Sequence, residues 1–381
     1  MTITDAPRFS YRSVQLDPAR SFLTVNEVRS ILDVMAAHKM SVLHMHLADD
    51  QGWRIQITNK GRKPGDTLDY TRLTSVSGHT AMDTQEHGYR DELGRTGFYT
   101  QQQYRSIVAY AAARHIMVVP EIDSPAHSNA MLHAFPELNS ANSHPETTVY
   151  GTVPQNGTSA VGERGAKLII SKSDAAYLDQ KYTPNTAIGL VWASNGHGGL
   201  RPYYDWDPAS VIPNSTDNDI LGIEGPQWSE TIRNGSQSQY LAFPRALAHA
   251  EIGWTPQSRR SVGDFLKRMA DDGARLLAMQ SNFYDTPEVT WGNDAAGHSG
   301  RHGAGSLQSG HHRNTGSTGD EGVPRRFVDD RRFHRGRRWH VRFDDQRLPH
   351  RERRLGDRRW RPEGTVRRSA SPRLADGGWA V

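Results

Sequence analysis

The run Asp49-Asp50-Gln51-Gly52-Trp53 combines residue types that can bind a polar ligand. Its carboxylates accept hydrogen bonds from hydroxyl groups, and an indole face can cover the apolar face of a sugar ring. The run follows Val42 to Leu47, which predicts a β-strand. Because ligand sites of α/β proteins form beyond the carboxyl ends of parallel strands, we predict a sugar site at the end of this strand.

The predicted strand also carries His44 and His46, two residues apart, as metal ligands are in the first strand of some barrel hydrolases. We interpret them as core histidines with hydrogen-bond partners, because no matching His, Lys and Asp ligands follow at later strand ends. The metal-hydrolase alternative requires bound metal in the purified protein.

Strand and helix signals alternate along the first 277 residues, which is typical of a parallel sheet with crossover helices. Residues 59–95 form a long polar insertion that we interpret as an active-site loop. We expect strands at Ser13–Asp17, Val42–Leu47, Ile116–Ile122, Lys167–Ser171 and Ile220–Glu224, and helices beginning after Thr24, after Thr100, near Pro244 and at Val262.

The composition excludes several classes of protein. The 381 residues include no cysteine, so there is no disulfide or thiolate chemistry. No run approaches the ~18 consecutive apolar residues of a membrane span, and we expect no membrane association. The amino-terminal residues lack the layout of a signal peptide, so we expect a cytoplasmic location by default.

The net charge of +4 conceals an unusual carboxyl-terminal region, residues 292–381, which contains 20 arginines and no Lys, Ile, Met or Tyr. So little apolar surface predicts a disordered Arg/Gly-rich tail. We expect no nucleic-acid binding, because acidic residues are interleaved and no aromatic platform is evident. The abrupt loss of residues with AT-rich codons supports the hypothesis that the tail is an out-of-frame product, which sequencing of the locus tests.

Several blocks in residues 11–291 together resemble glycoside hydrolase family 20, the β-N-acetylhexosaminidases. They occur in family order and cover most of that region. The blocks are Leu16-Asp17-Pro18-Ala19-Arg20, Asp49 to Arg54, Gly97 to Gln101, Pro120 to His127, Tyr177-Leu178-Asp179, Trp192-Ala193, Glu224 to Glu230 and Phe243-Pro244-Arg245.

The resemblance implies a (β/α)8 TIM-barrel-like fold whose pocket binds terminal N-acetylglucosamine or N-acetylgalactosamine, without a cofactor or metal. It implies retaining hydrolysis assisted by the substrate's own acetamido group, with an adjacent Asp-Glu pair as stabiliser and acid. The implied substrate-binding residues are Arg20, Tyr177, Asp179, Trp192, Trp228 and Glu230, supported by Asp49, Asp50, Trp53, Asp123 and His127.

The Asp-Glu pair itself is missing from the expected place. Asp91-Glu92 lies in the polar insertion, and no other Asp-Glu precedes residue 292. His127 and Tyr177 are much closer in sequence than in the family pattern. We therefore expect an incomplete barrel that lacks strands four to six, with a deletion between about residues 139 and 165.

These features predict a β-N-acetylhexosaminidase-like glycoside hydrolase that is impaired or inactive, with no catalytic residue assigned. Two alternatives stay open: a carbohydrate-binding pseudoenzyme that uses Arg20, Trp228 and Glu230, and a gene remnant that does not fold. Loss of barrel closure would expose strand edges and favour aggregation.

Overall fold

The computed structural model describes residues 5–82, 93–124, 126–138, 167–194, 198–213 and 215–292. Three predicted features lie outside these residues: the Asp91-Glu92 pair, the deletion at about residues 139–165, and the disordered tail. Of the tail, only residue 292 is described. Within the described residues no helix is both long and apolar enough to cross a membrane.

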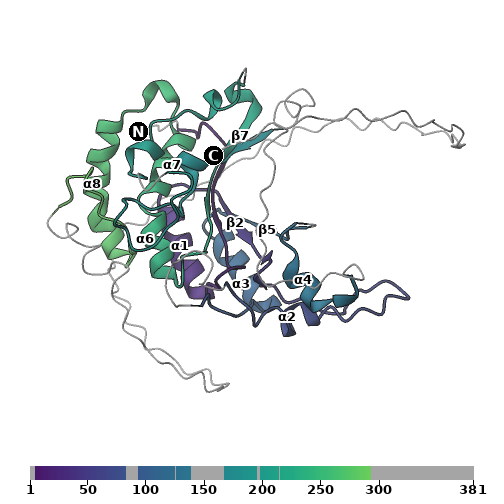
Figure 1. Ribbon diagram of the computed structural model, residues 1–381. Helices are drawn as coiled ribbons and strands as arrows, with labels where there is room; N and C mark the ends of the chain where they lie inside the picture. The colour runs from purple at the N-terminus through teal and green to yellow at the C-terminus, as the bar shows by residue number, and fades with distance from the viewer. Residues whose placement is uncertain are drawn as a thin grey trace, which may run out of the picture. The chain divides into compact units, whose positions relative to one another are not determined.

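The fold is built on one sheet of five parallel strands in the order β5-β2-β1-β7-β6 (Figure 1). Its strands are β1 (Tyr11–Leu16), β2 (Val42–His46), β5 (Met117–Glu121), β6 (Leu168–Ile170) and β7 (Ile220–Gln227). A separate two-stranded antiparallel hairpin is formed by β3 (Ala48–Asp49) and β4 (Gly52–Trp53).

The strand order is that of an incomplete barrel. The last strand, β7, pairs with the first, β1, with Ser13 beside Glu224, as the eighth strand pairs with the first when a barrel closes. The described residues contain no strand between β5 and β6 in the chain, so the sheet that they form is open. The prediction of a barrel-like sheet lacking strands four to six is confirmed for this part of the chain.

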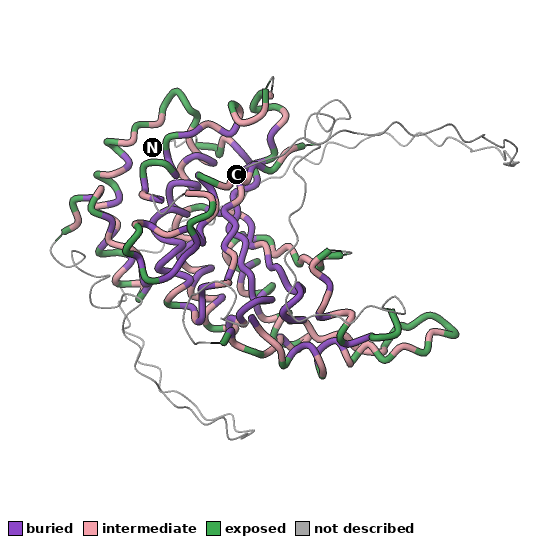
Figure 2. Tube along the Cα trace, viewed as in Figure 1, coloured by how far each residue is buried: buried purple, intermediate pink, exposed green. Residues whose placement is uncertain are grey.

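The helices cover one face of the sheet. The longer ones are α1 (Val25–Ala37), α3 (Gln101–Ala112), α6 (Gly235–Ala242), α7 (Arg245–Trp254) and α8 (Val262–Ala278), and the short ones are α2 (Arg72–Ser75), α4 (Asn129–Ala134) and α5 (Ser173–Ala176). Short 3-10 turns lie at Pro136–Leu138, Arg201–Tyr203, Pro208–Ser210, Asp217–Asp219 and Gln257–Arg259. Figure 2 shows that the buried residues are concentrated in the centre of the fold and that exposed residues lie on outer turns and on the outer faces of helices.

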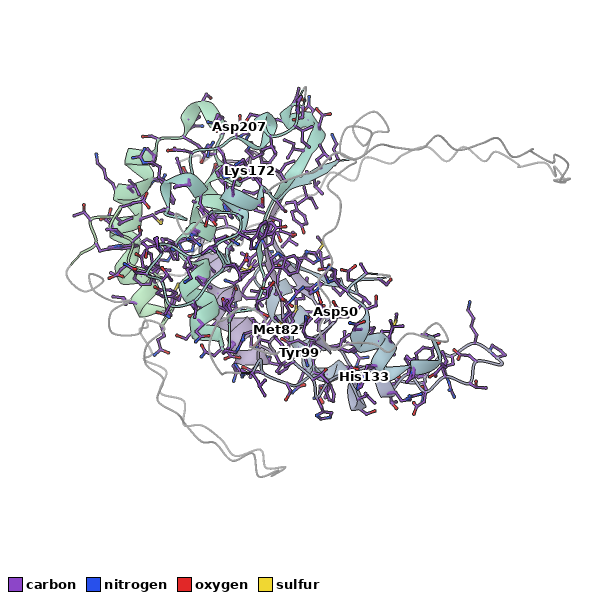
Figure 3. All side chains as sticks on the ribbon, viewed as in Figure 1. Asp50, Met82, Tyr99, His133, Lys172 and Asp207 are labelled. Carbon is purple, nitrogen blue, oxygen red and sulfur yellow. The ribbon has the colours of Figure 1, made fainter. Side chains whose placement is uncertain are left out.

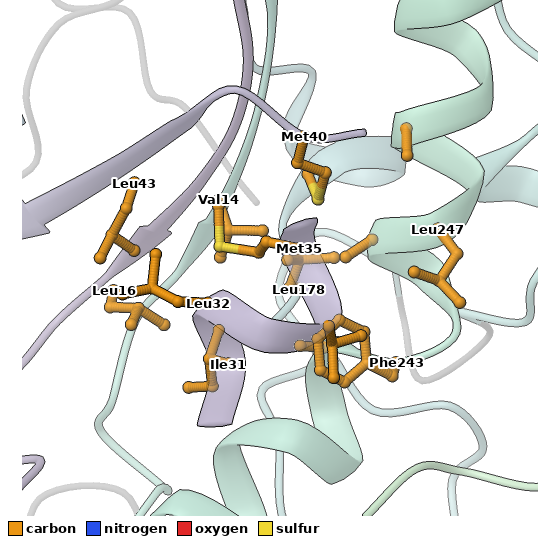
Figure 4. Close-up of a cluster of buried hydrophobic side chains, with 14 of the residues drawn as sticks. Val14, Leu16, Ile31, Leu32, Met35, Met40, Leu43, Leu178, Phe243 and Leu247 are labelled. Carbon is orange, nitrogen blue, oxygen red and sulfur yellow. The ribbon is translucent and has the colours of Figure 1, made fainter. Parts of the chain in front are cut away.

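The core forms because alternate strand residues point at these helices. Val14 and Leu16 of β1 and Leu43 of β2 are fully buried against Ile31 and Met35 of α1 (Figure 4). Burial of each such side chain contributes roughly 1.5–3 kcal/mol. The opposite face of the strands carries polar residues instead, so the sequence alternation separates the core from a polar face.

Most predicted elements are confirmed within a few residues, with two differences. β7 extends three residues beyond its predicted end, to Gln227, because the apparently irregular Gly225-Pro226 pairs with β1. Helix α6 was not predicted, since its Gly, Ser and Gln residues give no apolar periodicity. The side chain of its N-cap residue, Asn234, accepts the Gln237 N–H, and the burial of most of its residues stabilises the helix.

Helix α1 begins with a reciprocal capping box. The Thr24 hydroxyl accepts the Glu27 N–H, and the Glu27 carboxylate accepts the Thr24 N–H at 2.7 Å. The Thr24→Ala variant is expected to lose about 1 kcal/mol of unfolding free energy in urea titrations. Thr24→Ser, which keeps the hydroxyl, should lose much less, and equal losses in the two variants would contradict this role.

Candidate active site

Arg20 lies at the centre of a cluster of carboxylates beyond the carboxyl ends of β1, β2 and β7. Its Nη1 is 2.9 Å from Asp17 Oδ2, its Nη2 is 2.8 Å from Asp49 Oδ2, and its Nε is 3.9 Å from Glu230 Oε1. Ser229 also donates its N–H to Asp17, which ties the ends of β1 and β7 together. These contacts fix the guanidinium so that it can present hydrogen-bond donors to a ligand.

Asp49 is held in place by the β3–β4 hairpin and by two histidines. Its Oδ2 accepts from His46 Nε2 at 2.7 Å, and its Oδ1 is 3.4 Å from His127 Nδ1. Although burial disfavours charge, these histidines and Arg20 hold the pKa of Asp49 far below its usual range. The hairpin needs glycine at position 52, because a Cβ there would lie 2.2 Å from the Arg54 guanidinium.

The two histidines are correspondingly cationic. Burial favours the neutral imidazole of His46, but contacts with Asp49 and Glu121 raise its pKa to about 9. Hydrogen bonds to Asp49 and Asp50 raise the pKa of His127 to about 10. The backbone of His127 is left-handed, with φ of 51°, so the loop after β5 turns this side chain back towards the hairpin.

Two carboxylate oxygens near Arg20 are buried without a hydrogen-bond partner among the described residues: Asp179 Oδ1 and Glu230 Oε2. Burial, followed by the charge of Glu230, raises the pKa of Asp179 well above its ordinary value. Burial also raises the pKa of Glu230, against the effect of Arg20. Unpartnered buried acceptors cost free energy, so ligand hydroxyl groups would stabilise both.

Aromatic rings line the same region. Arg20 lies over the Trp228 ring, 5.2 Å from its centroid, and His46 meets Trp228 edge-on at 5.1 Å. Tyr177 contacts Trp228 and, at 5.5 Å, Trp192. Trp192 is 58% exposed, so it can stack on a ligand. Together these rings form an apolar wall beside the polar cluster, as sugar binding requires.

His44 links two further carboxylates on the polar face of the sheet. Its ring nitrogens are 3.2 Å from Glu121 Oε2 and 3.2 Å from Glu224 Oε1. Glu224 also accepts from the Tyr11 and Ser13 hydroxyls. Burial opposes the ionisation of Glu121, but His44 and His46 lower the pKa of this carboxyl group to about 2. The expectation that both strand histidines have hydrogen-bond partners is confirmed.

One group of side chains has the spacing of a cation site. Ligand atoms of Asp49, Asp50 and His127 lie within 4.8 Å of one another, the single such group among the described residues. Arg20 already contacts Asp49, and His127 is protonated at neutral pH. Arg20 and His127 therefore supply positive charge beside Asp49 and Asp50.

Nine of the predicted site residues lie near one another in the structure: Arg20, Asp49, Asp50, His127, Tyr177, Asp179, Trp192, Trp228 and Glu230. Their predicted roles in binding stay a prediction. Trp53 differs from the expectation that its indole face covers a sugar. It is 6% exposed, packs with Leu73 and Phe135, and donates its ring N–H to Ile55 O. Asp123 has no ion-pair partner among the described residues.

Arg54 was overlooked by the sequence analysis. Its guanidinium is fully buried and donates to the carbonyl oxygens of Ala19, Thr80 and Gly97. These contacts connect the loop after β1, which carries Arg20, to the polar insertion. They therefore help to hold Arg20 in position. The sequence carried one signal of this role, namely that Arg54 directly follows Trp53. An arginine exposed to solvent at that position would contribute nothing to the hairpin.

A polar cluster with an aromatic wall, beyond the carboxyl ends of the strands of a barrel-like sheet, is the arrangement found at the ligand sites of α/β-barrel proteins. The comparisons agree. The family model "Glycosyl hydrolase family 20, catalytic domain" matches residues 9–160 and 150–257. The chain therefore belongs to glycosyl hydrolase family 20.

Individual relatives cover most of the chain. A β-N-acetylhexosaminidase of Cellulomonas fimi is 27% identical, over 76% of this chain and 72% of its own. The solved structure of a family 20 β-N-acetylhexosaminidase from Streptomyces coelicolor A3(2) has a TM-score of 0.65 at 29% identity, covering 75% of this chain and 72% of its own. A mutant β-hexosaminidase of Streptomyces plicatus, solved with its product GlcNAc, has a TM-score of 0.64 at 29% identity, covering 75% and 72%.

Proposed function

We propose that this β-N-acetylhexosaminidase-like protein binds the terminal, non-reducing N-acetylhexosamine of β-linked glycans and hydrolyses it very slowly, if at all. The observation that carries the proposal is the pair of unpartnered buried oxygens, Glu230 Oε2 beside Arg20 and Asp179 Oδ1, whose carboxylate interacts with that of Glu230. A sugar ring supplies hydroxyl donors for both carboxylates and acceptors for the guanidinium. N-acetylglucosamine and N-acetylgalactosamine are both candidate ligands.

The acetamido group of the sugar would bind beside Tyr177 and Trp228, where a phenol donor lies next to an apolar wall. The retaining mechanism needs an ionised Asp beside this group and a protonated Glu at the leaving oxygen. The two glutamates on the polar face of the sheet, Glu121 and Glu224, do not meet the second need. The pKa of Glu121 and that of Glu224 are lowered by His44, so neither is an acid at neutral pH.

Two further proposals concern the extent of the domain. Residues 11–291 form the family domain, with a deletion between about 139 and 165 that removed the catalytic pair, and residues 292–381 are an unrelated tail. The two segments matched by the family model overlap at residues 150–160, inside the proposed deletion, which supports it. The large buried core argues against a remnant that cannot fold.

Turnover and binding test the proposal separately. Hydrolysis of a chromogenic N-acetylglucosaminide should be about 10²–10⁴-fold slower than for the Streptomyces coelicolor enzyme, since that is the usual cost of one missing acid catalyst. Titration calorimetry with N-acetylglucosamine should still detect binding. Turnover at the relative's rate would refute the loss of activity, and absence of binding heat would refute the sugar site.

A matched pair of variants tests which residues bind. Glu230→Gln should weaken N-acetylglucosamine binding about tenfold, because a charged acceptor contributes roughly 1.5–3 kcal/mol. Glu137→Gln, which alters an exposed glutamate paired with Arg72, should leave the affinity unchanged.

A further inference from the structure

The sheet has two open edges, one at β5 and one at β6. Among the described residues β5 pairs with β2 alone, and β6 pairs with β7 alone. The outer side of each edge strand therefore presents backbone N–H and C=O groups that no described strand satisfies. Such edges are templates for pairing with another chain.

Apolar side chains gather at the same two edges. Met117 of β5 is 56% exposed and Ile169 of β6 is 42% exposed, although both are strand residues. Ile122, just after β5, and Leu221, which lies beside β6 on β7, are exposed as well. Exposed apolar residues on unpaired strand edges indicate an interaction surface.

We propose that a second copy of this chain covers both edges, with β5 of each copy pairing with β6 of the other. The five strands are all parallel, so a two-fold axis along the strand direction brings unlike edges together and keeps every strand parallel. Both interfaces form at once, and ten strands close into a barrel with no open edge. Pairing of β5 with β5 about an axis along the strands would leave both β6 edges open.

Charges at the edges complement each other in this arrangement. Parallel pairing brings the carboxyl ends of β5 and β6 together. Asp123 lies just beyond that end of β5, and Lys172, which is labelled in Figure 3, follows β6. Lys172 contacts only exposed Asp174 in the described residues, and Asp123 has no ion-pair partner there. Opposite charges therefore meet at each of the two interfaces, which favours this register and orientation.

The polar cluster around Arg20 lies beyond the carboxyl ends of the strands. Because the proposed axis runs along the strands, the two copies would present their clusters at the same end of the barrel. Dimer formation requires no sugar, so its test is independent of the proposed sugar binding.

Analytical ultracentrifugation of the full chain tests the proposal. The chain should sediment as a dimer at micromolar concentration. Met117→Glu and Ile169→Lys should each raise the dimer dissociation constant at least about tenfold, since a lone charge is placed in an apolar contact. The double variant Met117→Glu/Ile169→Lys should regain dimer, because it places opposite charges on the two strands that pair with each other. Both sites are exposed, so the monomer should tolerate the changes.

Lys267→Glu is the control, because Lys267 is exposed on α8, a helix that is not among the elements packed on β5 or β6 in the described part of the chain. This variant should remain dimeric. A monomeric wild-type chain, an open series of larger assemblies, or a dimer that neither edge substitution weakens would each overturn the proposal. Failure of the double variant to regain dimer would exclude the β5–β6 pairing.

Discussion

Replacing Arg20 by methionine is expected to lower the free energy of unfolding by about 3–5 kcal/mol, the usual effect of removing one partner from a buried ion pair. Arg20 contacts Asp17 at 2.9 Å and Asp49 at 2.8 Å, and these carboxylates are almost completely buried. Without the guanidinium, each must ionise in a poorly hydrated site or take up a proton. Urea unfolding followed by fluorescence measures the loss.

Binding and stability can be separated by a second substitution. The double variant Arg20→Met/Asp49→Asn removes the charge on both sides and should regain part of the lost stability. It should still fail to give binding heat with N-acetylglucosamine, since the donors to the sugar are absent. Arg105→Met, at an exposed arginine of α3, should change neither property. An unchanged unfolding free energy in the Arg20 variant would show that the cluster is solvated.

The elements with local signals were predictable from the sequence. Thr24 and Glu27 form a capping box within four residues, and α1 is found where that pattern places it. The strand that ends at His46 is also local, because its apolar residues alternate and its polar turn follows at once. In both cases the interactions that decide the structure lie within a few residues of one another.

The parts that depend on distant contacts were not predictable. Arg54 has the charge of a typical surface residue, yet it is buried by carbonyl groups from two connections, the one after β1 and the one between α2 and α3. Trp53 was expected to cover a sugar ring, but it packs in a buried cluster with Phe135, which follows β5 in the chain. The charge of His46 follows from its register with Glu121 on the neighbouring strand. No pattern inside one segment records such pairings.

The open sheet changes what membership of the family implies. In a closed barrel the polar face of the strands points inward, and side chains from the other strands complete it. Here His44, Glu121 and Glu224 satisfy one another on that face. This pairing explains how a polar interior surface stays stable in the described part of the chain, and why these carboxylates would be poor acid catalysts.

Alkaline pH is expected to destabilise the protein through His46. The pKa of His46 is raised from 6.5 to about 9, because Asp49 and Glu121 outweigh the effect of burial. A raised pKa means that its contribution, on the order of 3 kcal/mol, is fully present below pH 6.5 and is lost as the pH rises through about 9. Urea unfolding at pH 6.5, 8 and 9.5 should therefore show a falling free energy.

The His46→Gln variant should be less stable at pH 6.5 and should show a shallower decline, because the group that titrates is gone. His44 and His127, whose pKa values are also raised, would account for the decline that remains. His133→Gln, at an exposed histidine of α4, should retain the full wild-type decline. If His46→Gln and wild type decline in parallel, His46 is not the charged centre that joins Asp49 to Glu121, and the stability of the cluster depends on Arg20 alone.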